Sequence, residues 1–169
     1  SSDLLLASEN FAKKFSDTPV WLKGIGQKTT SASFTKNPNF TQMNSTKEAA
    51  KIAFAMSKLT SANVDVIEIH DAFSVCEPMI LEDLNFAKKG EGLLLSKNMY
   101  DTFDRKINPR GGLIGTGHPL GATGVSQTVE VVQQIQGKAE KRQIENANIG
   151  LVHNMSAAAT SSTVLLLES

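Results

Sequence analysis

Short apolar segments of strand length alternate along this chain with longer segments in which apolar residues recur at helical spacing. Strands are predicted at residues 3–7, 20–25, 64–69, 149–152 and 163–167. Helices are predicted at residues 9–15, 45–58, 73–85, 97–105 and 120–136. This α/β order, βαβαβαββ, predicts a sheet covered by helices, because each helix must bury its apolar side against the sheet.

Several residues typical of helix ends stand at the predicted boundaries: Ser8 and Ser45 or Thr46 as N-caps, Pro78 in or near a first turn, and Gly137 just past a last turn. Residues 27–44 are polar and poor in glycine, which predicts a long loop. Such a loop is either a functional lid or interface segment, or simply disordered, and the sequence leaves both interpretations open.

The composition narrows the class of protein. A chain of 169 residues fits one domain. Lys+Arg and Asp+Glu both number 17, so we expect neither nucleic acid nor a membrane surface as a partner. Cys76 is the sole cysteine and the chain starts with Ser-Ser-Asp, so we expect a reducing, cytoplasmic setting. No apolar run approaches the ~20 residues that span a bilayer.

The three histidines occupy distinctive positions. His70 ends a predicted buried strand, His118 lies in a glycine-bounded loop before a helix, and His153 ends the penultimate strand. Ligands of α/β sheets bind where strands end and loops meet helices. A single histidine of this kind is more often structural than catalytic, but three at one sheet edge predict a shared site.

The loop at residues 111–124 is the most informative stretch. Its glycines allow a substrate to approach the main chain, and Pro119 stiffens the entry to the following helix. It lacks the lysine and the Ser/Thr ending of a P-loop and does not fit a dinucleotide loop. A positioned imidazole at His118, acting as a general base or as a donor to an oxyanion, fits better.

Three motifs of this chain resemble motifs of the thiolase superfamily and occur in the same order along the sequence. Gly117-His118-Pro119 with the following Leu-Gly-Ala-Thr-Gly is similar to its Gly-His-Pro motif, and His70-Asp71-Ala72-Phe73 is similar to the His-Asp-x-Phe variant of its Asn-Glu-Ala-Phe motif. His153-Asn154 stands where the sterol-carrier-protein and archaeal subfamilies carry His-Asn. The resemblance runs from Asp3 to Glu168.

The resemblance implies a thiolase-like fold of two βαβαβαββ halves, of which residues 1–169 are the second, with a mixed five-stranded sheet. The nucleophilic cysteine would lie at a helix N-terminus in the first half. His118 would activate that cysteine and, with His70, form an oxyanion hole for a thioester carbonyl. His153 would line the same pocket near the α-carbon of the substrate. Substrate-binding positions would be Phe73, Gly117, Pro119, Asn154 and Met155.

The partners that the resemblance implies are an N-terminal thiolase half, an acyl-CoA substrate and further copies in a homo- or hetero-oligomer. A coenzyme A thioester is expected as substrate, with no metal and no other cofactor. An OB-fold acyl-CoA-binding protein is a further expected partner if the chemistry is that of an aldolase.

Departures from the family pattern concern proton transfer at the α-carbon. Met155 replaces a thiolase cysteine, Ala157 replaces the glycine two residues on, and Ala72 stands where sterol-carrier-protein thiolases carry a cysteine. Cys76 lies one helical turn beyond Ala72, although an isolated cysteine on a buried helix is usually an apolar filler. The alanine run at 157–159 should narrow the pocket or shift a backbone donor.

We therefore expect a thiolase C-terminal domain for Claisen-type acyl transfer between CoA thioesters, such as acetoacetyl-CoA formation or cleavage. One alternative is an aldolase or acyltransferase of the same superfamily, in which Tyr100 would be a candidate residue. The other is a non-catalytic scaffold subunit whose histidines are relics.

Overall fold

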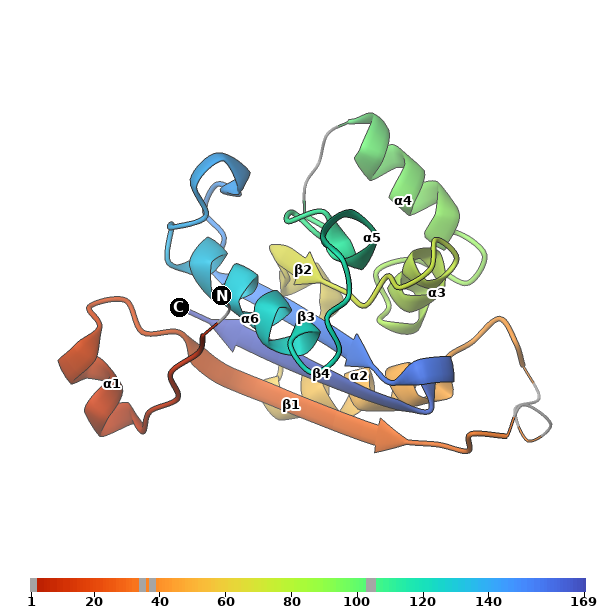
Figure 1. Ribbon diagram of the computed structural model, residues 1–169, viewed down its shortest axis with the longest axis horizontal. Coiled ribbons are helices and arrows are strands. Elements are labelled where there is room, and N and C mark those ends of the chain that lie inside the picture. Colours follow the sequence, from red (N-terminus) through yellow and green to blue (C-terminus); the bar gives the residue numbers. More distant parts are fainter. Residues whose placement is uncertain (1–2, 34–35, 37–38, 103–105) are drawn as a thin grey trace.

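The computed structural model describes residues 3–33, 36, 39–102 and 106–169. The described residues form a four-stranded sheet in the order β1-β4-β3-β2 (Figure 1). Its strands are β1 Trp21–Thr29, β2 Val66–Glu68, β3 Ile149–Met155 and β4 Ser161–Glu168. β4 pairs antiparallel with β1 and β3, and β2 runs parallel to β3. The predicted α/β class and the mixed sheet are confirmed.

The fifth strand predicted at residues 3–7 is not formed. This segment is irregular, and Leu5 and Leu6 are 83% and 84% exposed. A strand needs a neighbour to satisfy its main-chain donors and acceptors, and no described strand of this chain pairs with the segment. The apolar pattern that predicted a strand was therefore not sufficient to form one.

The helices are α1 Glu9–Phe15, α2 Asn44–Ser57, α3 Cys76–Asp83, α4 Gly92–Asp101, α5 Gly112–Thr116 and α6 Thr123–Ile135. Short 3-10 turns include η2 Ser61–Asn63, η3 Glu140–Arg142 and η4 Ala157–Ala159. Pro78 lies in the first turn of α3 as predicted. α4 starts before the predicted helix at 97–105, whose last three residues lie outside the described ones. Within the described chain no helix is long and apolar enough to cross a membrane.

Helices cover both faces of the sheet. α2 packs on β1 and β4, whereas α6 packs on β3 and β2 from the other side (Figure 1). The α2 face buries Leu151, Val164 and Leu166, and the α6 face buries Val66 and Val152. Side chains that alternate along a strand therefore enter different layers, and this alternation decides which residues of β3 reach the functional site.

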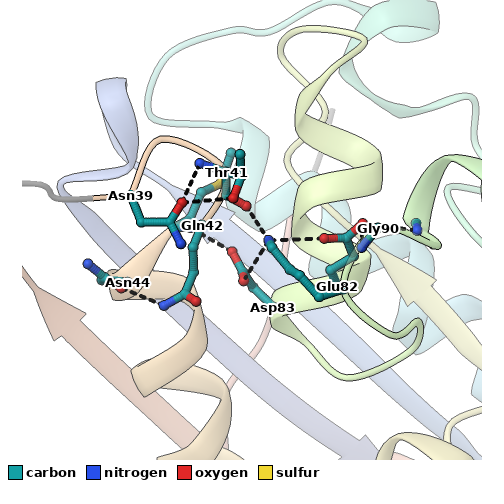
Figure 2. A network of polar contacts seen from close by, with 10 residues as sticks. Asn39, Thr41, Gln42, Asn44, Glu82, Asp83 and Gly90 are labelled. Atoms are coloured by element: carbon teal, nitrogen blue, oxygen red, sulfur yellow. Dashed lines mark hydrogen bonds and ion pairs between the residues drawn. The ribbon is translucent and has the colours of Figure 1, made fainter.

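The loop between β1 and α2 is tied to α3 by charged groups (Figure 2). The main-chain N–H of Met43 donates to the buried carboxylate of Asp83 at 2.6 Å. Lys89 pairs with Glu82 at 3.0 Å and also contacts Asp83. Burial raises the pKa of the Asp83 carboxyl above its usual value. The predicted loop at 27–44 begins later, because β1 continues to Thr29, and these contacts fix its last residues.

Two glycines let the backbone of α2 lie directly against β1. A Cβ placed on Gly26 would lie 1.9 Å from the carbonyl oxygen of Ala49, and one on Gly24 would lie 2.4 Å from that of Ala53. Both neighbours are main-chain atoms in the middle of a helix, so neither can move without displacing the helix. The close packing that the alanines of this helix predicted is confirmed.

Gly26→Ala should therefore destabilise the fold by about 1–3 kcal/mol or more, because the added methyl overpacks a backbone contact. The free energy of unfolding from urea titration measures the effect. Gly115→Ala is the matched control, since a Cβ there meets no atom within 4 Å. Equal stability of the two variants would contradict the packing described here.

Candidate active site

The rings of His70 and His118 lie in contact. Their centroids are 4.7 Å apart and the ring planes meet at 86°, an edge-to-face arrangement. His70 follows the end of β2, and His118 follows α5. Both rings line an open cavity of about 1610 Å³, here called the histidine cavity, whose wall also includes Phe73, Asn154 and Met155. The predicted convergence of His70 and His118 is confirmed.

Asp71 joins the two segments that carry the histidines. Its buried carboxylate accepts the main-chain N–H of Leu113 at 2.6 Å, within the first turn of α5. A Cβ on Gly112 would lie 2.1 Å from the same carboxylate, so only glycine fits beneath it. Gly112 and Gly117, at either end of α5, both adopt positive φ, of 63° and 87°. The chain is thereby turned so that His118 meets His70.

The hydrogen bonds of His118 leave its outer nitrogen free to accept a proton. Nδ1 lies 2.7 Å from the hydroxyl oxygen of Thr123, and that hydroxyl donates to the carbonyl oxygen of Pro119 at 3.1 Å. A hydroxyl has a single hydrogen, so when the Thr123 hydroxyl donates to Pro119 its oxygen accepts from Nδ1, and Nδ1 carries the proton. Nε2 of His118 then holds a lone pair, which is what a general base requires.

His70 is buried and neutral. Its Nδ1 lies 3.0 Å from the side-chain nitrogen of Asn154. Burial first, and the neighbouring His118 second, lower the pKa of His70 to about 4. At neutral pH the ring is therefore uncharged, with one donor and one acceptor nitrogen.

His153 does not reach the histidine cavity, contrary to the expectation from sequence. Its side chain is fully buried on the α2 face of the sheet, where Nε2 lies 3.0 Å from the hydroxyl of Thr46. That hydroxyl also contacts Ser162 at 3.0 Å, and neither Ser45 nor Thr46 is the predicted N-cap, because α2 already begins at Asn44. Burial lowers the pKa of His153 to about 3. Because side chains alternate along β3, Asn154 takes the cavity face instead.

The other predicted residues divide between the cavity wall and its surroundings. Phe73, Asn154 and Met155 line the cavity, whereas Gly117 and Pro119 flank His118 without lining it. Tyr100 is 83% exposed on α4 and does not line the cavity either. Among the described residues, no group of three or more His, Cys, Asp or Glu is placed to hold a metal ion.

The cavity wall also carries the positions that depart from the family pattern. Ala72, Met155 and the turn at Ala157–Ala159 all line it, and so does Cys76. Burial raises the pKa of the Cys76 thiol. Ala158 and Ala159 adopt φ of 55° and 51°, a left-handed conformation that favours glycine. The alanines thus hold the turn in a conformation suited to glycine.

Glu68 is a buried acid beside the site that sequence reasoning missed. It precedes His70 by two residues on the same side of the strand and has no exposed surface. Its Oε1 accepts the main-chain N–H of Arg110 at 3.5 Å, and Oε2 has no partner among the described residues. Burial, only partly offset by Arg110, raises its pKa to about 8. The available signal was a glutamate between two isoleucines, Ile67 and Ile69, in a strand predicted to be buried.

Comparisons with known proteins place the chain among thiolases. Residues 26–169 match the family described as "Thiolase C-terminal domain-like". The acetyl-CoA acetyltransferase of Methanothermobacter thermautotrophicus is 39% identical over 163 residues, which are 95% of this chain and 43% of that protein. Human sterol carrier protein 2 is 45% identical over 111 residues, which are 64% of this chain and 20% of that protein.

A solved structure titled "Ltp2-ChsH2(DUF35) aldolase" has a similar fold. It superposes with a TM-score of 0.79 at 17% identity, over 95% of this chain and 42% of that one. At this identity the likeness concerns the fold alone. The chain spans less than half the length of each of these relatives.

Glu68→Gln should remove a pH dependence of stability. The folded chain keeps a proton on Glu68 up to a pH of about 8, whereas the unfolded chain releases it near the usual value of 4.5. The folded state binds more protons in that window, so stability present below it is lost as the pH rises. As the pH rises through that window, the unfolding free energy of the variant should therefore increase relative to that of the wild type by up to about 1.4 kcal/mol per pH unit.

Urea titrations at several pH values between these limits measure that difference. Glu91→Gln is the control, because Glu91 is exposed. A difference between Glu68→Gln and wild type that stays constant with pH would contradict a protonated Glu68.

Proposed function

Because this chain belongs to the family of thiolase C-terminal domains, we propose that it is the histidine-bearing half of a thiolase-type acyltransferase. It acts in Claisen condensation or thiolysis of CoA thioesters of the acetoacetyl-CoA type. The observation that carries the proposal is the contact of the His70 and His118 rings, 4.7 Å apart at one cavity. Coenzyme A enters as part of the substrate, and we expect no further cofactor.

The nucleophile is a cysteine of an N-terminal half. Cys76 is unsuited to that role, since burial raises the pKa of its thiol and only the thiolate attacks. His118 Nε2 removes the proton from the thiol of that cysteine, and the resulting thiolate attacks the carbonyl carbon of the thioester. The bond to the CoA sulfur then breaks, and the released thiolate takes up the proton from His118. An acyl group remains on the cysteine.

His70 stabilises the negative oxygen that develops on the thioester carbonyl. A neutral imidazole N–H is a suitable donor, because it remains fixed while charge appears on the substrate. The lowered pKa of His70, about 4, keeps the ring from titrating at neutral pH. Phe73, Asn154 and Met155 form the surrounding wall, and Gly117 and Pro119 hold the loop that presents His118.

The N-terminal half covers the apolar part of the histidine cavity. The cavity wall continues from the histidines along α6, through Val125, Val129 and Val132, to the exposed leucines near the start of the chain. Apolar surface of this extent is unfavourable in water, which supports a covering partner and a homo- or hetero-oligomer. A cytoplasmic location remains an expectation from composition.

A second candidate is an aldolase of the same superfamily working with an OB-fold acyl-CoA-binding protein. The observation that favours it is the presence of Ala72 and Met155 in the cavity wall, where the resemblance would place a proton-transfer thiol. Tyr100, the residue that the sequence suggested for this alternative, is exposed on α4 and does not line the cavity. A scaffold without catalysis is the third candidate and is distinguished by mutation of His118.

His118→Ala in the full protein should lower kcat for thiolysis of acetoacetyl-CoA by about 10²- to 10⁴-fold, since the general base is lost. Size-exclusion chromatography should give the same oligomer as wild type. Tyr100→Phe is the control and should leave kcat unchanged. Full turnover by His118→Ala would favour the scaffold.

Thiolysis and retro-aldol cleavage should be assayed on the same assembled protein, with acetoacetyl-CoA plus CoA and with a β-hydroxyacyl-CoA. The acyltransferase proposal expects cleavage of the β-keto substrate only when free CoA is present. Cleavage of the β-hydroxy substrate without CoA, and none of the β-keto substrate, would assign the aldolase instead.

A further inference from the structure

Gln127 is a fully buried amide that the mechanism above does not use. It lies on α6, and its side chain has two hydrogen-bonded neighbours. Its Nε2 donates to the main-chain carbonyl oxygen of His153 at 3.3 Å. Its Oε1 accepts the side-chain N–H of Asn154 at 2.8 Å. Asn154 in turn reaches His70, so Gln127 stands one residue behind the catalytic ring.

The direction of this hydrogen-bond chain is fixed by the main-chain carbonyl of His153 at its end. A main-chain carbonyl oxygen can only accept, so Gln127 must turn its NH₂ group towards His153. Its oxygen then faces Asn154, which must present its own NH₂ group. The same nitrogen of Asn154 lies 3.0 Å from Nδ1 of His70. Nδ1 must therefore accept, and in a neutral ring the proton sits on Nε2.

The consequence is that the N–H of His70 lies on Nε2, the ring nitrogen that does not face Asn154. No residue that the structure describes hydrogen-bonds Nε2 of His70, so its N–H is available to a ligand. His118 has the opposite arrangement, with the proton on Nδ1 and a lone pair on Nε2. Two imidazoles in contact thus differ in chemistry because their hydrogen-bond partners differ: His70 meets the amide of Asn154 and His118 meets the hydroxyl of Thr123.

We propose that Gln127 is a positioning residue which, through Asn154, fixes His70 in the Nε2–H form that donates to the thioester oxygen. The inference rests on the proposed function for the identity of the acceptor, but the tautomer itself does not depend on it. Without Gln127 the amide of Asn154 is free to rotate. Its oxygen would then face Nδ1, which favours the Nδ1–H form and removes the donor from Nε2.

The tautomer is measured directly by ¹⁵N NMR of the full protein labelled with ¹⁵N-histidine. The three histidines of this chain are assigned by single substitution. In the wild type at pH 8, Nε2 of His70 should have a pyrrole-like, protonated shift and Nδ1 a pyridine-like shift. The reverse pattern would overturn the proposal without any variant being made.

Two variants test the chain of amides at the same pH. Asn154→Asp places an acceptor against Nδ1, so it should reverse the His70 pattern and lower kcat by about 10²-fold with little change in KM. Gln127→Met removes both amide bonds at similar volume. It should give intermediate shifts for His70 and lower kcat by roughly 3- to 10-fold.

Gln134→Met is the matched control. Gln134 is also buried on α6 and hydrogen-bonded, to Glu130 and to the main chain of Arg142 and Ile144. Its loss should reduce stability as much as the loss of Gln127, yet leave the His70 shifts and kcat as in the wild type. Unchanged shifts and kcat in Gln127→Met would show that Gln127 only fills space.

Failure of this inference is distinguishable from failure of the proposed function. If His118→Ala keeps full turnover while the wild-type His70 shifts are as expected, the acyl-transfer role is wrong and the tautomer assignment stands. If His118→Ala is inactive while His70 carries its proton on Nδ1, the function stands and the role of Gln127 is wrong.

Discussion

The hydrogen bond from Leu113 to the Asp71 carboxylate, 2.6 Å long, is the contact on which the rest of the site depends. It connects the residue after His70 to the helix that leads to His118, and it is buried. Gly112 lies so close to this carboxylate that no side chain fits at that position. The distance between the two imidazoles is therefore set by a hydrogen bond from a main-chain N–H to a carboxylate rather than by the rings themselves.

The alternation of β3 supplies the second constraint. Asn154 shares the α6 face with Val152, and His153 shares the α2 face with Leu151. A shift of one residue in the register of this strand would exchange the two layers. Through this arrangement His153 contributes its main-chain carbonyl to the site, while its ring stays among hydroxyls in the core. The sheet thus positions His70 directly and His118 through α5.

Much of the fold and the central pair of histidines could be predicted from sequence. The strand end at His70 and the glycine-bounded loop at His118 both point to one sheet edge, and the structure brings them together. The position of His153 could not be predicted, because the strand was expected to end at Val152. It continues to Met155, and the alternation then turns the ring of His153 inward.

The remaining differences have similar physical causes. The leucine-rich segment at 3–7 has the pattern of a strand, but a strand also needs a neighbouring strand, and none of the described strands pairs with it. Gln127 and Glu68 are buried polar residues. Buried polar groups usually have hydrogen-bond partners, but the sequence does not identify which residues those partners are. Local sequence pattern thus predicts elements and strand ends, whereas side-chain pairing between layers depends on the three-dimensional packing.

We propose that the attacking sulfur belongs to a cysteine outside residues 1–169, and trapping the acyl-enzyme tests this most directly. The full protein is incubated with radiolabelled acetyl-CoA, quenched in acid, digested and mapped by mass spectrometry. We expect acetyl on a cysteine outside residues 1–169, with Cys76 unmodified. Acetyl on Cys76 would contradict this proposal, because the histidines would then serve a nucleophile within this chain.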